Sequence, residues 1–176
     1  KYRVFYKDLG SADSKVVALV DEFEASYDFI DNDGSVMYFA TDKNAPRKRI
    51  VAIDVRKPAE ANWKQVVPES KETLMGASLL NNQLVTEYLA DARSMVKVFD
   101  LKGKAVRDIA LPGIGSASGF NGKRKDSETF YSFTGFTNPT TIYRLDLKNG
   151  KSTVFRQPKV DFYSCNYKAT TEFYTS

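Results

Sequence analysis

The chain has 176 residues, of which 26 are Lys or Arg, 22 are Asp or Glu and 42% are hydrophobic. This composition is typical of a globular protein and excludes a disordered, collagen-like or coiled-coil chain. The net charge of +4 comes from basic and acidic residues that are mixed along the chain. It predicts no nucleic-acid partner, because proteins that bind nucleic acids gather their basic residues in one patch.

Short runs rich in β-branched and aromatic residues follow one another along the chain, and Gly, Pro, Asn or Asp bounds each run. Such runs are typical of antiparallel strands, and we predict strands at residues 16–20, 36–40, 50–53, 84–89, 96–99 and 129–133. The best helical candidate, around residues 58–63, is no longer than one turn. The sequence therefore predicts an all-β fold.

A repeat of 46 residues orders these strands. Aspartates recur at this interval, and a hydrophobic residue stands four positions before each one, in the pairs Val4 and Asp8, Ile50 and Asp54, Val96 and Asp100, and Ile142 and Asp146. Four short strands in a period of this length are typical of a β-propeller blade. We expect each aspartate to cap its own turn through side-chain to backbone hydrogen bonds, and the hydrophobic residues to lie between blades.

The repeat predicts blades at residues 24–70, 71–113 and 114–160. Residues 1–23 would supply only the last two strands of an incomplete blade. The predicted fold is a partial β-propeller of about three and a half four-stranded antiparallel blades. Because an open arc of blades leaves two apolar sheet faces exposed, we expect further blades or a second copy of the chain to cover them.

The sequence excludes several kinds of catalytic site. It contains no histidine, so this chain cannot form a Ser-His-Asp or Cys-His system. The glycine-rich segment 113–119 has Ala117 where a nucleophile elbow has its serine, and residues 28–34 do not fit the ligand positions of a calcium loop. We predict no catalytic residue, no metal site and no cofactor in this chain.

Two further features bear on the cellular compartment. The one cysteine, Cys165, cannot form an internal disulfide, which fits a reducing compartment. No apolar run approaches the ~20 residues that a membrane-spanning helix needs. We therefore expect a cytoplasmic protein without a membrane partner.

Several separated segments resemble one region of a known family. They are TDKNAPRKRI (41–50), WKQVVPE (63–69) and DSETFYSFTGFTNP (126–139), and they are similar to the propeller of the prolyl oligopeptidase family. The resemblance implies the C-terminal half of a seven-bladed propeller that lies over a serine-peptidase domain, which cleaves short peptides after proline. It also implies that the catalytic Ser, Asp and His belong to an α/β-hydrolase domain outside this sequence. Residues 161–176 would be the exit strand toward that domain.

The segment GKRKD (122–126) resembles a basic segment at the mouth of the family's tunnel, and Arg124 and Lys125 match its basic pair. The resemblance implies a substrate-gating role for Lys123, Arg124 and Lys125, because basic side chains at a low-dielectric opening raise the local concentration of anions. A solvated turn between two strands is the alternative interpretation of the same three charges.

The sequence thus favours the gating and interdomain portion of a prolyl oligopeptidase-like serine peptidase. Its partners would be the missing propeller blades and the α/β-hydrolase domain, and its substrates would be short peptides. One alternative is a stand-alone half-propeller interaction module that completes a ring by dimerisation. Another is the recognisable part of a processed or incompletely sequenced enzyme.

Overall fold

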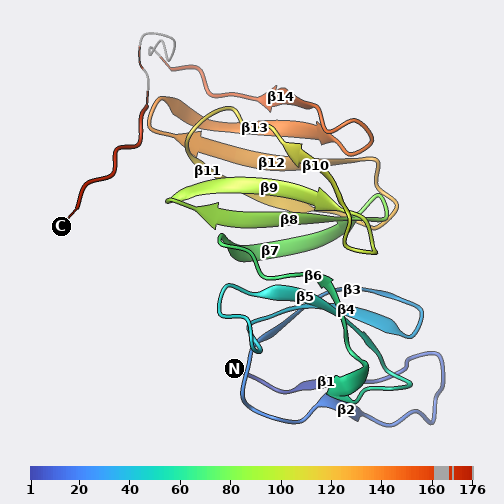
Figure 1. Cartoon of the computed structure of the whole chain (residues 1–176). Helices are drawn as coiled ribbons and strands as arrows, with labels where there is room; N and C mark the ends of the chain where they lie inside the picture. The colour runs from blue at the N-terminus through green and yellow to red at the C-terminus, as the bar shows by residue number, and fades with distance from the viewer. Residues whose placement is uncertain (161–166, 168, 176) are drawn as a thin grey trace. The chain divides into compact units, whose positions relative to one another are not determined.

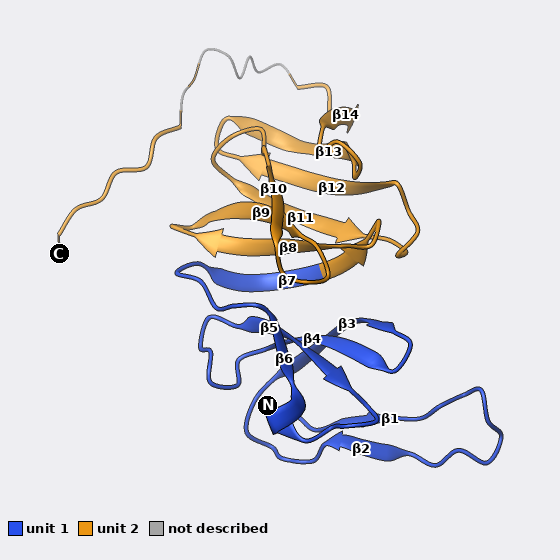
Figure 2. Cartoon of the chain, turned by 45° about the vertical axis from the view of Figure 1, so that its right-hand side comes forward, with its two compact units in different colours: residues 1–77 blue, residues 78–176 orange. Residues whose placement is uncertain are grey.

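The computed structural model describes residues 1–160, 167 and 169–175, and Figure 1 traces the chain. It divides into two compact units, residues 1–77 and residues 78–176 (Figure 2). Cys165 and most of the predicted exit strand, 161–176, lie outside the described residues. No helix among the described residues is long and apolar enough to cross a membrane.

The first unit contains two antiparallel sheets. A two-stranded sheet pairs β1 (Val4–Tyr6) with β2 (Val17–Val20), and a four-stranded sheet has the order β3-β4-β5-β6. Its strands are β3 (Tyr27–Asp33), β4 (Val36–Thr41), β5 (Arg49–Asp54) and β6 (Lys64–Val67). A single 3-10 turn, η1 (Glu60–Asn62), lies where the sequence predicted no more than one helical turn.

One hydrophobic core lies within this unit. It joins residues of β2 to residues of the four-stranded sheet, and its buried members are Leu19, Val20, Ala25, Tyr27, Phe39, Val51 and Ile53. The two β5 residues of this core are two positions apart in the strand. Successive side chains of a strand point to opposite faces of the sheet, so alternate residues share a face. Val51 and Ile53 therefore face the same core.

Two four-stranded antiparallel sheets follow, in the orders β10-β9-β8-β7 and β11-β12-β13-β14. The strands of the first are β7 (Thr73–Leu80), β8 (Gln83–Ala90), β9 (Arg93–Phe99) and β10 (Ala105–Ile109). Those of the second are β11 (Ser116–Asn121), β12 (Glu128–Gly135), β13 (Asn138–Asp146) and β14 (Ser152–Arg156). The boundary between the two units falls inside β7.

A second hydrophobic core lies between these two sheets. It combines Val85, Val96, Val98 and Ile109 of one sheet with aromatic residues of the other, among them Phe120, Tyr131 and Phe133. The rings of Phe120 and Tyr131 stack with centroids 4.7 Å apart. Burying aromatic side chains of this size contributes strongly to the stability of a core.

The four periodic aspartates make the same hydrogen bond. In each case Oδ1 accepts the backbone N–H of the residue two positions later, at Gly10 (2.8 Å), Arg56 (3.0 Å), Lys102 (2.8 Å) and Lys148 (2.8 Å). This is the Asx-turn geometry. The prediction that each aspartate caps its own turn is confirmed.

Ile142 differs from its expected burial. The repeat predicts this residue between blades, but it is 36% exposed, and Phe130 on the neighbouring strand is 38% exposed. Both lie on the face of β11–β14 that points away from the core described above, which takes Tyr131, Phe133 and Leu145 from the opposite face. Nothing in the described part of the chain covers this outer face.

Candidate functional site

The basic segment predicted from the sequence forms the loop between β11 and β12. The backbone N–H of Lys123 donates to Asp126 Oδ2 (2.7 Å), and the N–H of Asp126 donates to the Lys123 carbonyl (2.9 Å). Gly122 allows a close approach at this point, because a Cβ there would lie 2.8 Å from Asp126 Oδ2 and 3.1 Å from Leu80 Cδ2. The loop is therefore a closed turn that lies against the end of β7.

Arg124 joins this loop to the turn between β7 and β8. Its Nε donates to Asn82 Oδ1 (2.7 Å), and the backbone N–H of Asn82 donates to the Arg124 carbonyl (3.3 Å). Asn81 and Asn82 both adopt positive φ, at 50° and 54°, a conformation that asparagine tolerates better than most residues. These two asparagines form the turn between β7 and β8, and Asn82 hydrogen-bonds the loop between β11 and β12.

The three residues of the predicted gating set thus differ in what they do. Arg124 is half-buried and takes part in the contact with Asn82. Lys123 and Lys125 are exposed. Lys125 lines a depression of about 500 Å³ together with Asn121, Asp126, Ser127, Glu128, Thr129 and Phe130.

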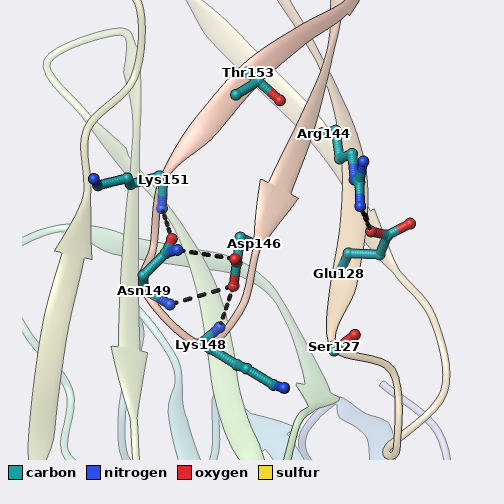
Figure 3. A pocket seen from close by; sticks show the side chains of 8 residues that line it. All are labelled: Ser127, Glu128, Arg144, Asp146, Lys148, Asn149, Lys151 and Thr153. Atoms are coloured by element: carbon teal, nitrogen blue, oxygen red, sulfur yellow. Dashed lines mark hydrogen bonds and ion pairs between the residues drawn. The ribbon is translucent and has the colours of Figure 1, made fainter.

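A second depression, of about 360 Å³, adjoins the first through Ser127 and Glu128. Figure 3 shows the residues that line it, Ser127, Glu128, Arg144, Asp146, Lys148, Asn149, Lys151 and Thr153. They come from the end of the β11–β12 loop, from β12, β13 and β14, and from the turn between β13 and β14. Because Glu128 pairs with Asp146 across the two strands, this turn and the basic loop lie at the same end of the sheet.

The two carboxylates of this depression already have partners. Arg144 Nε donates to Glu128 Oε2 at 2.6 Å. The Asp146 carboxylate accepts hydrogen bonds from the backbone N–H of Lys148 (2.8 Å) and from Asn149 Nδ2 (2.8 Å). The backbone hydrogen bond from Lys148 holds the pKa of Asp146 below its ordinary value. Asp146 is thus part of a turn and is ionised near neutral pH.

The basic side chains at this end of the sheet are differently placed. Figure 3 shows Lys148 and Lys151 extending away from the Asp146 carboxylate, and both residues are exposed. Together with Lys123 and Lys125 they give this end of the sheet four exposed ammonium groups. Such a cluster attracts anions in solution.

The acidic side chains and the glycine-rich segment have structural surroundings. Among the residues that the structure describes, no group of three or more Cys, Asp and Glu side chains is placed to hold a metal ion. The glycine-rich segment 113–119 is packed tightly, because a Cβ at Gly115 would overlap the Thr134 carbonyl. The chemistry that remains at this end of the sheet is the electrostatic attraction of anions by its exposed lysines.

The sequence identified the basic loop but missed its partner. Two adjacent asparagines are typical of a local turn, and such a signal carries no information on a contact 42 residues further along the chain. The Arg144–Glu128 ion pair was missed for a related reason, because the two residues become neighbours only through the register of β12 and β13. The sequence signal that could have singled out Arg144 is a departure from the repeat, since the hydrophobic Val98 stands 46 residues earlier.

Comparison with known proteins gives consistent matches over almost the whole chain. The family described as the prolyl oligopeptidase N-terminal β-propeller domain matches residues 1–158. The prolyl endopeptidase of Elizabethkingia miricola is 37% identical over 173 residues, which cover 98% of this chain and 24% of that protein. The prolyl endopeptidase of Dictyostelium discoideum is 30% identical, over 92% of this chain and 23% of that protein.

Solved structures give the same result. One from a structural and mechanistic study of two prolyl endopeptidases matches with a TM-score of 0.84 and 37% identity, over 92% of this chain and 24% of that chain. Prolyl oligopeptidase B of Galerina marginata, as the apo protein, matches with a TM-score of 0.85 at 24% identity, over 96% of this chain and 25% of that chain, and indicates the fold alone.

The chain spans about a quarter of the length of these relatives. The predicted family resemblance and the predicted partial β-propeller are both confirmed. The four-stranded sheets are thus propeller blades, and the chain belongs to the prolyl oligopeptidase N-terminal β-propeller domain family.

Proposed function

We propose that this chain is the substrate-gating and interdomain portion of the propeller in a serine peptidase that cleaves short peptides after proline. The observation that carries the proposal is the match of residues 1–158 to the family's propeller. The sequence contains no histidine, so the bond-breaking steps belong to an α/β-hydrolase domain elsewhere in the parent protein. The role of this chain is to select what reaches that domain.

The gating role rests on the exposed charges of the basic loop. Lys123 and Lys125 are exposed, and the loop that carries them is closed by hydrogen bonds with Asp126. Ammonium groups on a fixed loop at an opening attract the carboxylates of short peptides and raise their local concentration. The interaction is long-range, so it weakens as the ionic strength rises.

The partners of this chain are the remaining blades of the ring and the hydrolase domain. The outer face of β11–β14 supports the first part of this proposal, because it exposes Phe130, Ile142 and Phe155. The rings of Phe130 and Phe155 contact each other edge to face, with centroids 4.8 Å apart. A neighbouring blade that covers this face would remove three apolar side chains from water, which is favourable.

A second copy of the chain is the alternative occupant of the same face. In that case the function is that of an interaction module, and the chain completes its ring by dimerisation. Gel filtration separates the two possibilities, because a self-paired module elutes at twice its 19.8 kDa mass. If a blade of the parent protein covers the face instead, the complete protein does not dimerise through this face and elutes as a monomer.

A peptidase assay tests the proposed function. We expect the complete parent protein to cleave a fluorogenic peptide after proline and to lose activity with a serine-directed inhibitor. The 176-residue chain alone should give no turnover with the same peptide. Turnover by the homogeneous chain, or a complete protein that does not cleave after proline, would contradict the proposal.

A further inference from the structure

The contact between Asn82 and Arg124 links the basic loop to the preceding blade in two ways. The Asn82 side chain accepts a hydrogen bond from Arg124 Nε at 2.7 Å, and the Asn82 backbone N–H donates to the Arg124 carbonyl at 3.3 Å. One bond therefore holds the side chain of Arg124 and the other holds its backbone. The residues immediately before and after Arg124 are the two exposed lysines of the loop.

The geometry of the β7–β8 turn sets the direction of this contact. Asn82 has a φ of 54°, a left-handed conformation that fixes where its N–H and its side chain point. On the other side, Gly122 lets the loop approach Leu80, which is fully buried at the end of β7. The loop thus contacts the neighbouring sheet at Gly122, just before its basic stretch, and at Arg124, in the middle of that stretch.

We infer that Asn82 is a positioning residue for peptide selection: it holds Arg124, and through Arg124 it fixes the places of Lys123 and Lys125. This inference rests on the proposed gating function and identifies the contact that holds the basic loop in its conformation. Arg124 would then act mainly as the link between two blades, and the two lysines would face the carboxylate of the incoming peptide. A charge that is held in place before binding loses less conformational entropy when the ligand arrives.

Two substitutions at Asn82 and one at its neighbour separate this role from a general effect on folding. Asn82→Gly keeps the left-handed backbone but removes the side-chain acceptor. Asn82→Asp keeps an oxygen acceptor for Arg124 and tolerates the same φ. Asn81→Gly is the matched control, because Asn81 lies in the same turn with a φ of 50°, and its side chain makes no hydrogen bond to the loop in the described part of the chain.

The first measurement is hydrogen exchange in the complete parent protein. We expect Asn82→Gly to speed the exchange of the Lys123 and Asp126 amides, which close the loop. Asn82→Asp and Asn81→Gly should leave both amides at the wild-type rate. Unchanged exchange in Asn82→Gly, or equally fast exchange in all three variants, would overturn the inference.

The second measurement is kinetic and uses two prolyl peptides of the same sequence, one with a free C-terminal carboxylate and one amidated. Asn82→Gly should raise KM for the carboxylate peptide by about two- to fivefold, the range that an exposed charge contributes, with kcat unchanged and the amidated peptide unaffected. Asn81→Gly should match the wild type with both peptides. A rise in KM for both peptides alike would assign Asn82 a purely structural role and overturn the inference.

The double variant Lys123→Ala, Lys125→Ala distinguishes the inference from the function on which it rests. If this variant raises KM for the carboxylate peptide and Asn82→Gly does not, the positioning role is wrong and the gating role stands. If the double variant leaves KM unchanged for the carboxylate peptide, the gating role itself is wrong.

Discussion

Val96 and Ile142 occupy equivalent positions of the repeat, 46 residues apart, yet Val96 is 2% exposed and Ile142 is 36% exposed. Val96 belongs to the core between the two sheets of the second unit, where β11–β14 covers it. Ile142 lies on the outer face of β11–β14, which nothing in the described residues covers. The same position is therefore core in one blade and surface in the next.

This difference predicts unequal effects of the same substitution. Val96→Asp should destabilise the 176-residue chain by about 3–5 kcal/mol, because it places an unpaired charge in a core. Ile142→Asp should cost less than about 1 kcal/mol in the same chain, since the new carboxylate stays in contact with water. Urea denaturation of the two variants measures the difference.

The complete parent protein supplies the control for this pair. There we expect the cost of Ile142→Asp to approach that of Val96→Asp, because another blade covers the outer face. Equal costs in the isolated chain would mean that the outer face is already covered there, contrary to the structure.

The hydrogen bonds of the periodic aspartates predict a loss of stability when one of these residues is replaced. Asp100 Oδ1 accepts the backbone N–H of Lys102 (2.8 Å) and of Lys104 (2.9 Å). Asp100→Ala should therefore lower the free energy of unfolding by about 0.5–1.5 kcal/mol. Asp100→Asn should recover most of this loss, because its amide oxygen can accept the same bonds. Chemical denaturation checks both, and an Asn variant as unstable as the Ala variant would contradict the capping role.

The turn at Asp146 predicts a dependence of stability on pH. The backbone hydrogen bond from Lys148 lowers the pKa of Asp146 in the folded chain, so the carboxylate is favoured by folding. Its contribution is present above the pKa of an unfolded aspartate, about 3.9, and is lost as the pH falls through the lower folded value. We expect the urea midpoint to fall below about pH 4 and to fall less in Asp146→Asn. An identical pH profile for the variant would contradict this role.

Lys43 is the centre of an ion-pair cluster in the first unit. Its Nζ contacts Glu24 and lies 2.7 Å from Glu60 Oε2, while its side chain is only 13% exposed. The hydrogen bond to Glu24 raises the pKa of Lys43. Lys43→Met should lower the free energy of unfolding by about 1 kcal/mol, because it leaves Glu22, Glu24 and Glu60 near one another without this cation.

The exposed Lys148 gives a matched control for this variant. Lys148→Met should change stability by less than about 0.5 kcal/mol, as is usual for a surface substitution. Raising the salt concentration should reduce the effect of Lys43→Met, since ions screen partly exposed pairs. Equal effects of the two substitutions would show that the cluster contributes nothing specific.

The blade repeat could be predicted from the sequence because it depends on local features. The aspartate of each turn hydrogen-bonds a residue two positions away, and the alternation of side chains along each strand is visible in the order of the residues. These signals act within a few residues, so they do not depend on the tertiary structure.

The exposure of Ile142 and the partner of Arg124 could not be predicted in this way. Ile142 has the same residue type as buried Ile50, and its exposure depends on what lies beside the last sheet rather than on its own repeat. Arg124 reaches Asn82 across 42 residues, through the packing of one sheet on another. Both features depend on how neighbouring sheets pack against each other, and a short sequence motif carries no information on that packing.

An experimental structure of the complete polypeptide that contains these 176 residues is the most direct test. We expect a ring of four-stranded sheets in which a further blade covers Phe130, Ile142 and Phe155, with the loop of Lys123 and Lys125 facing the opening. A structure in which these sheets form a flat sandwich, or in which that face of β11–β14 stays in water, would contradict the propeller assignment of this chain.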